Sequence, residues 1–210
     1  MTPIMLWGGA AFLALVPSPV GGREPGHAAA LRAAVKPAVA AGATIAATAE
    51  AAIDLVPIVV SALGECPNRL PIEQRWRIAR VIDRESAEHG YDPLFVTALM
   101  QVESGCLATA RGGDALGMVQ LLPSTAREVA KRLGMPWRGE QTLTEPALNI
   151  EIGVHYLREL EEQLGDPYLA VAAYNMGPAR VLQMSSDRAR RTQYVRKVVL
   201  RYERLLDLFA

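Results

Sequence analysis

"ALMQVESGCL", residues 98–107, places one carboxylate, Glu103, at the end of an otherwise apolar helical run. Upstream, Asp92 and Pro93 predict the start of this helix, because aspartate is a good N-cap and proline suits the first helical position. Gly105 predicts its end. Apolar residues lie on most sides of the segment, so it is expected to be a buried helix: Leu94, Phe95, Val96, Leu99, Met100 and Val102.

A carboxylate at the end of a buried helix is expected to have a raised pKa. The negative end of the helix dipole and the apolar neighbours both disfavour its ionised form. A carboxylic acid that is still protonated near neutral pH can act as a general acid at a glycosidic bond. The alternative is a glutamate that merely reaches solvent at a helix terminus, which is the commoner case for an isolated glutamate.

The segments around this stretch predict further helices. They are located by helical periodicity, by Gly90 and Gly165 as end signals, and by a second Asp-Pro start at 166–167. Thr125 and Glu128 suit a capping box. The expected helices cover 73–89, a segment from Thr125 through Leu133, 146–164, a short stretch from 167 to "AYNMGP", and 188–208. No stretch alternates at period two, so the predicted fold class is all-α.

Composition divides the chain near residue 65. Residues 1–65 are rich in Ala, Val and Gly, and we predict a signal-like leader and an Ala-rich segment there, with a globular domain over 66–210. Residues 3–17 form an apolar run of signal-peptide length, although no Lys or Arg precedes it. Residues 31–60 could instead be the export signal, and the Ala-rich region 28–62 could be a partner-binding helix or merely a leader and tether. Either segment predicts a periplasmic or otherwise exported protein.

Charge and cysteine content limit the kinds of partner. Lys plus Arg and Asp plus Glu are both 22, so a nucleic-acid partner is not expected. The three histidines and two cysteines lack metal-ligand spacing, so no metal and no cofactor are expected. Cys66 and Cys106 could form one disulfide in an oxidising compartment, or could be two small buried thiols.

Five blocks of the sequence resemble, in order, the lytic transglycosylases with a soluble-transglycosylase-type, lysozyme-like catalytic domain. The blocks are "ALMQVESG" (98–105), "ALGMVQLLPSTA" (115–126), "EPALNIEIGVHYLREL" (145–160), "AVAAYNMGP" (170–178) and "QYVRKV" (193–198). The resemblance covers roughly residues 76–202. It implies an all-α, goose-type-related lysozyme-like fold behind the Ala-rich N-terminal segment.

The resemblance also implies a chemistry with a single carboxylate. Family members cleave the β-1,4 bond between N-acetylmuramic acid and N-acetylglucosamine in peptidoglycan and form a 1,6-anhydro ring. Glu103 matches the position of the catalytic acid, which protonates the leaving oxygen and then deprotonates the muramyl C6 hydroxyl. No water is added, so no second carboxylate is needed, unlike in the usual glycosidase scheme.

Seven further residues match positions that contact the substrate or the acid in this family. They are Ser104, Gly117, Met118, Gln120, Tyr174, Asn175 and Tyr194. Gln120 is expected to donate its amide to sugar groups, Met118 to bring a thioether to the saccharide, and Tyr194 to reach the acid with its hydroxyl. For several of them a structural role is the alternative: core filling for Met118, an ordinary helix-end residue for Ser104 and a helix-surface residue for Tyr194.

Two departures from the family pattern leave alternatives open. "RARRTQY" (188–194) lacks the acid that commonly precedes the late tyrosine, and Asp114 stands where the family commonly has glycine. Asp114 could be a surface-loop residue, or a second carboxylate that would make the protein a hydrolytic muramidase. A third possibility is a non-catalytic glycan-binding subunit of an envelope machine. By analogy alone, the small size suits a partner in secretion or conjugation machinery.

Overall fold

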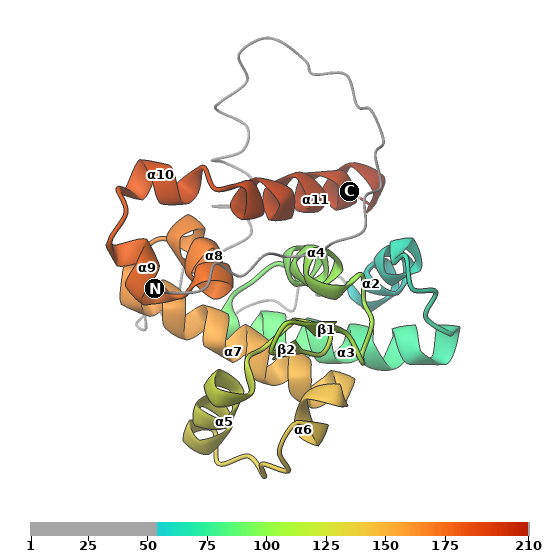
Figure 1. Cartoon of the computed structure of the whole chain (residues 1–210). Coiled ribbons are helices and arrows are strands. Elements are labelled where there is room, and N and C mark those ends of the chain that lie inside the picture. The colour runs from blue at the N-terminus through green and yellow to red at the C-terminus, as the bar shows by residue number, and fades with distance from the viewer. Residues whose placement is uncertain (1–53, 210) are drawn as a thin grey trace, which may run out of the picture.

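The structure is a computed structural model that describes residues 54–209, and the predicted leader in 1–53 lies outside the described residues. Helices make up 71% of the described residues, so the all-α prediction is confirmed (Figure 1). In chain order the elements are α2 (Val56–Ala62), the 3-10 helix η1 (Leu63–Glu65), α3 (Ile72–His89), α4 (Pro93–Ser104), β1 (Arg111–Gly112), β2 (Ala115–Leu116), α5 (Pro123–Arg132), α6 (Gln141–Thr144), α7 (Pro146–Leu164), α8 (Pro167–Met176), α9 (Pro178–Leu182), α10 (Ser186–Arg190) and α11 (Gln193–Phe209). No helix within residues 54–209 has both the length and the apolarity needed to cross a membrane.

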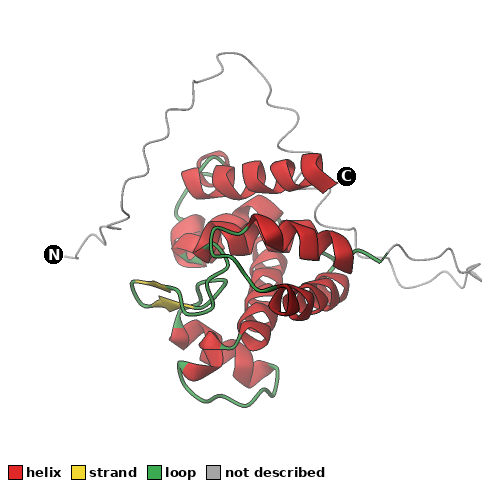
Figure 2. Cartoon of the chain, turned by 90° about the vertical axis from the view of Figure 1, so that its right-hand side faces the viewer, coloured by secondary structure: helices red, strands yellow, loops and turns green. Residues whose placement is uncertain are grey.

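Helix α4 lies at the centre of the fold, as its apolar sequence predicts. All its residues from Pro93 to Gln101 are buried, and α2, α3 and α11 pack against it. Figure 2 shows α4 crossing the middle of the molecule beneath α11. Asp92 caps the helix by accepting a hydrogen bond from the Leu94 amide at 2.7 Å, and its other oxygen accepts one from the Tyr202 hydroxyl of α11 at 3.0 Å. The cap therefore fixes the start of α4 and also joins it to α11.

Gly105 ends α4 as predicted, and a disulfide holds this end in place. Gly105 has φ +60°, a left-handed conformation that glycine adopts without strain. Cys66, directly after η1, is bonded to Cys106, with 5.9 Å between the two Cα atoms. The Asn68 amide also donates to the carbonyls of Ser104 and Gly105. Of the two outcomes considered for the cysteines, the structure contains the disulfide, and it fixes the helix end that carries Glu103.

The folded body begins before the predicted domain boundary at residues 65 and 66. Val59, Ala62 and Leu63 have no exposed surface, and they belong to the same core as α3 and α4. Composition alone placed this segment with the leader, because its Ala and Val content does not distinguish an export signal from a short core helix. The described body therefore includes α2 and η1.

Two predicted helix starts are corrected, and a hairpin is added. Helix α5 begins at Pro123, where proline occupies the first turn, and no side chain caps it, so the capping box of Thr125 is wrong. The predicted helix over 188–208 is divided into α10, which Ser185 caps, and α11. Strands β1 and β2 pair antiparallel with only two residues each, too short to give a period-two signal.

Candidate active site

Glu103 lies in the last turn of α4, half-buried beside the first turn of α11. The Tyr194 hydroxyl of α11 donates a hydrogen bond to Glu103 Oε1, which confirms the predicted reach of Tyr194. Within residues 54–209, Glu103 forms no ion pair. Burial raises the pKa of Glu103 to about 7, and the hydrogen bond from Tyr194 partly opposes this rise. The expectation of a raised pKa is confirmed, with burial as the main cause.

The hydrogen bond from Tyr194 decides which oxygen of Glu103 carries the acidic proton. Burial and the neighbouring Glu103 raise the pKa of Tyr194 well above its usual value, so its hydroxyl keeps its proton at neutral pH and acts as a donor. Because Oε1 accepts that hydrogen bond, the proton of the neutral carboxylic acid belongs on Oε2. The pair can therefore present a protonated Oε2 to a substrate while Tyr194 holds the carboxyl group.

The loop from Gly117 to Gln120 lies next to the end of α4 and is closed at its base by backbone hydrogen bonds between Leu116 and Leu121. Gly117 has φ +84°, and a Cβ there would lie 2.2 Å from the Leu143 carbonyl oxygen. No side chain fits at this position. Gly117 is buried and shapes the loop, and its predicted role as a substrate contact stays a prediction.

Gln120 uses its amide nitrogen within the loop. Its Nε2 donates to the carbonyl oxygens of Gly117 at 2.8 Å and Ala110 at 3.1 Å. Two carbonyl partners fix the orientation of the amide, because only its NH2 end can donate. In this arrangement the amide hydrogens of Gln120 are used within the loop and its carbonyl oxygen is the free acceptor, while the donation to sugar groups stays a prediction.

Met118 and Ser104 connect the loop to α4. Met118 is 1% exposed, which fits its alternative role as core filling, and its predicted contact with the saccharide stays a prediction. The Ser104 hydroxyl donates to the Met118 carbonyl oxygen at 2.6 Å. Ser104 thereby holds the loop against the helix end next to Glu103 and acts as a positioning residue.

Helices α7 and α8 hold the loop from its other side. The Tyr174 hydroxyl of α8 donates to the Val119 carbonyl at 2.9 Å, so this residue, which matches a substrate position of the family, also supports the loop. Asn149 of α7 is fully buried, accepts from the Val119 amide at 2.8 Å and donates to the Leu116 carbonyl at 3.2 Å. A Cβ at Gly153 would lie 2.4 Å from Val119 Cγ2, so glycine permits this close approach.

Sequence reasoning missed Asn149 and Gly153. Both interrupt the apolar face of the helix over 146–164, and an amide or a glycine among buried aliphatic residues indicates a loop packed against that face. Two other predicted residues make no contact that tests their role. Asn175 is exposed near the end of α8 without a side-chain hydrogen bond to the described residues, and Asp114 is exposed in the turn between β1 and β2. Their roles stay predictions.

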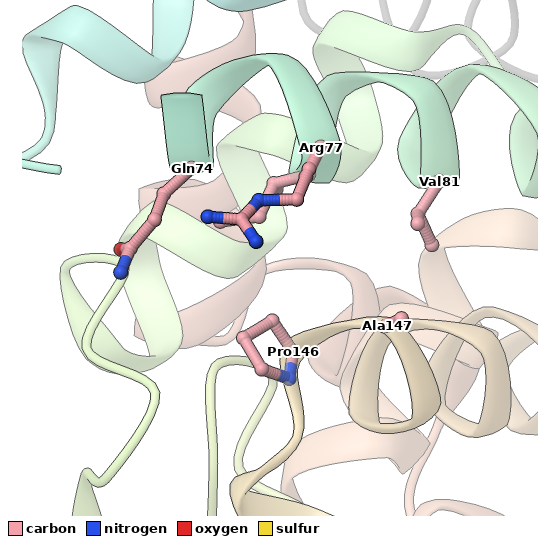
Figure 3. A pocket seen from close by; sticks show the side chains of 6 residues that line it. Gln74, Arg77, Val81, Pro146 and Ala147 are labelled. Atoms are coloured by element: carbon pink, nitrogen blue, oxygen red, sulfur yellow. The ribbon is translucent and has the colours of Figure 1, made fainter. Parts of the chain in front are cut away.

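A groove and a group of possible metal ligands lie away from the predicted site residues. A groove of about 270 Å³ between α3 and the start of α7 is lined by Gln74, Arg77, Ile78, Val81, Pro146 and Ala147, none of them a predicted site residue (Figure 3). Within the described part of the chain, one group could bring three metal-ligating atoms together: Glu85, Glu88 and His89 on α3. Glu85 already pairs with Arg84, at 2.6 Å.

Comparison with known proteins places these residues in a family. Residues 80–196 match the family model described as "Transglycosylase SLT domain". The endo-type membrane-bound lytic murein transglycosylase A of Klebsiella pneumoniae (strain 342) is 35% identical, over 57% of this chain and 64% of the relative. The protein of the same name in Salmonella paratyphi B has the same identity and coverage. The chain thus spans less than two thirds of the length of these curated relatives.

Solved structures agree with this assignment. An inactive mutant of the lytic transglycosylase Slt of Pseudomonas aeruginosa is 29% identical, with a TM-score of 0.53 over 68% of this chain and 26% of that one. The 70 kDa soluble lytic transglycosylase of Escherichia coli is 25% identical, with a TM-score of 0.53 over 62% of this chain and 24% of that one. The similarity is therefore to one part of much longer proteins.

Proposed function

Because the chain belongs to the transglycosylase SLT domain family, we propose that it is a peptidoglycan lytic transglycosylase. It cleaves the β-1,4 bond between N-acetylmuramic acid and N-acetylglucosamine and leaves a 1,6-anhydromuramic acid end. The observation that carries the proposal is the environment of Glu103. Its carboxyl group has a neutral partner, Tyr194, and a pKa raised to about 7, so it is a proton donor near neutral pH.

The reaction needs one carboxyl group in two successive roles. Protonated Oε2 of Glu103 gives its proton to the glycosidic oxygen, the bond from that oxygen to the muramyl C1 breaks, and positive charge develops at C1. The resulting carboxylate removes the proton of the muramyl C6 hydroxyl, and O6 bonds to C1. Glu103 is then protonated again, and no water is consumed. Tyr194 donates to Oε1 throughout and stabilises the carboxylate while it exists.

Two other functions remain as alternatives. A hydrolytic muramidase would use Asp114 as a second carboxylate, and a glycan-binding subunit would use none. The exposed position of Asp114 in the hairpin turn supports a surface residue. The raised pKa of Glu103 supports an enzyme, because a binding subunit has no need of a buried carboxyl group that lacks a compensating charge.

We further propose that the protein works outside the cytoplasm, in the periplasm or elsewhere in the cell envelope. The disulfide between Cys66 and Cys106 supports an oxidising compartment, and the relatives above are named membrane-bound murein enzymes. Peptidoglycan glycan strands are the proposed partner. Association with secretion or conjugation machinery has no support in the comparisons and stays a prediction from analogy.

Mass spectrometry of the products released from purified peptidoglycan tests the reaction. The full chain is compared with its Glu103→Gln and Asp114→Asn variants. We expect anhydro products from the wild type and Asp114→Asn, one water lighter than muramidase products, and none from Glu103→Gln. Reducing-end muramic acid products that disappear with Asp114→Asn would establish the muramidase instead. An absence of products from the wild type would favour the binding subunit.

A further inference from the structure

The zero net charge of the chain conceals a separation of charge along it. Eight of the 22 basic residues, but only three of the 22 acidic ones, lie between Pro178 and Phe209. This segment, which forms α9, α10 and α11, therefore carries a formal charge of +5, and the rest of the chain carries −5. A charge separation of this size can orient a protein towards a polyanion.

Most cations of this segment are exposed and free of ion pairs. Within residues 54–209, no ion pair involves Arg180, Arg188, Arg196, Lys197 or Arg204, all of them exposed. We call these five residues, which lie on the consecutive helices α9, α10 and α11, the cationic face. Arg190, by contrast, pairs with Asp166 at 2.8 Å and with Asp187 at 3.7 Å. Exposed cations without acidic partners remain available to an anionic ligand.

The cationic face lies beside the candidate active site. Lys197 lies three residues after Tyr194, and so next to it on the surface of α11, whereas Arg196 points away from Tyr194; α10 immediately precedes that helix. α9 and α10 pack against α8, which carries the predicted substrate residue Asn175 (Figure 1). A glycan bound at Glu103 would thus place its substituents near α9, α10 and the start of α11.

We propose that the cationic face binds the carboxylates of the peptides attached to the glycan, and so favours peptide-bearing strands over bare ones. The inference rests on the proposed function, because it takes peptidoglycan as the ligand. The stem peptides carry free carboxylates, and the proposed reaction brings them to α8 and the helices packed against it, which carry the unpaired cations. Exposed ion pairs of this kind steer association and set preference between substrates.

An anionic membrane is the other polyanion that such a surface could meet. Leu182 and Leu200 are exposed on the same segment, at 66% and 49%, and cations interspersed with apolar side chains occur on membrane-surface helices. The peptide assignment is favoured because the cations lie on α11, which carries Tyr194, and on α9 and α10, which pack against the helix of Asn175. Membrane binding is therefore included in the test as an opposing outcome.

The test uses the full chain and two triple variants with the same change in net charge. The first carries Arg188→Gln, Arg196→Gln and Lys197→Gln, within the cationic face. The control carries Arg69→Gln, Arg80→Gln and Lys131→Gln, which are exposed and lie on other elements. Each is assayed for product release from peptide-bearing strands and from the same glycan after an amidase has removed the peptides.

Binding is measured separately from turnover, so that the two proposals can fail separately. The same triples are built on Glu103→Gln and cosedimented with intact sacculi over a series of salt concentrations. We expect the cationic-face triple to lower both kcat/KM on peptide-bearing strands and sacculus binding by roughly tenfold, since each exposed ion pair contributes a factor of about two. Turnover of bare glycan and all values for the control triple should stay unchanged.

Three results would overturn the inference. Equal losses on peptide-bearing and bare glycan would assign the three cations to the glycan itself, and no loss on either would leave them without a role in substrate binding. Unchanged sacculus binding together with lost binding to phosphatidylglycerol vesicles would assign the face to a membrane. A wild type that binds sacculi through this face but releases no product would contradict the proposed function and leave the binding inference standing.

Discussion

Glu85 and Glu103 are both shielded from solvent in this helical body, but only Glu85 has a positively charged partner. Glu85 of α3 is 3% exposed, and its carboxylate pairs with Arg84 at 2.6 Å and faces His89 at 3.9 Å. Glu103 of α4 has the hydroxyl of Tyr194 and no cation. Burial removes water from both carboxyl groups, but only Glu85 has a positive charge in its place. The comparison indicates that an uncompensated carboxyl group, and not burial alone, makes a proton donor.

Removal of the acid should have the largest effect. Glu103→Gln should lower turnover of peptidoglycan by roughly a thousandfold or more, because general acid and base catalysis are both lost. Glu85→Gln should leave turnover per folded molecule unchanged. Product release measured beside circular dichroism separates catalytic loss from unfolding. A Glu85→Gln variant that folds but loses activity to the same extent would contradict the distinction between the two glutamates.

The same Glu103→Gln substitution should stabilise the protein, and only at higher pH. Because the pKa of Glu103 is raised in the folded state to about 7, the stability that its protonated form gives is present below the unfolded pKa and is lost as the pH rises through 7. Glutamine avoids this loss. We expect it to add about 2 kcal/mol to the free energy of unfolding at pH 8, after allowance for partial exposure, and close to nothing at pH 4.

Urea denaturation at the two pH values measures this difference. The wild type at pH 8, where Glu103 is mostly ionised, is the reference for the variant. If the Glu103→Gln variant were as stable as the wild type at both pH values, ionisation of the carboxyl group would carry no desolvation cost. Burial would then not be the cause of the raised pKa of Glu103.

Loss of the tyrosine hydroxyl should have a smaller effect on the rate. Tyr194→Phe removes the donor that stabilises the carboxylate and lowers the pKa of Glu103, so that pKa should rise further. Turnover should fall by about tenfold, since one hydrogen bond to a charged group contributes about 1.5 kcal/mol. The alkaline limb of kcat/KM should move to higher pH. A limb that moves to lower pH would contradict the assigned direction of the hydrogen bond.

Glu85→Gln should have the smallest effect, opposite in sign to that of Glu103→Gln. It removes the charge that Arg84 pairs with, and this pair is open to solvent on the arginine side, which is 58% exposed. We expect a loss of about 1 kcal/mol in the free energy of unfolding at pH 7. Chemical denaturation of the two glutamine variants side by side checks the signs, and stabilisation by both would remove the contrast.

The sequence predicted the parts of the site that depend on local signals. Asp92, Gly105 and Gly165 mark helix ends through their own backbone preferences, and each lies where expected. Glu103 and Tyr194 could be paired only through the ordered family blocks, because 91 residues separate them. Local pattern and family order together therefore located the acid and its partner.

The remaining parts depend on contacts between distant segments. Residue 117 must be glycine because a side chain there would collide with the Leu143 carbonyl. Asn149 must be an amide because it both accepts from and donates to the backbone of the loop at Val119 and Leu116. Neither contact has a signal within its own helix or loop that identifies the partner. The net charge likewise contained no sign of the cationic face, since the balancing acids lie on other elements.

The most direct test of this account is the titration of Glu103 itself. The full chain, labelled with ¹³C at the glutamate side-chain carboxyl carbon, is followed by NMR from pH 3 to pH 9, with Glu103→Gln as the reference that identifies the resonance. The account predicts one resonance, missing from the variant, that titrates with a pKa near 7. A Glu103 resonance that titrates with a pKa below about 5, in the ordinary range for glutamate, would contradict it.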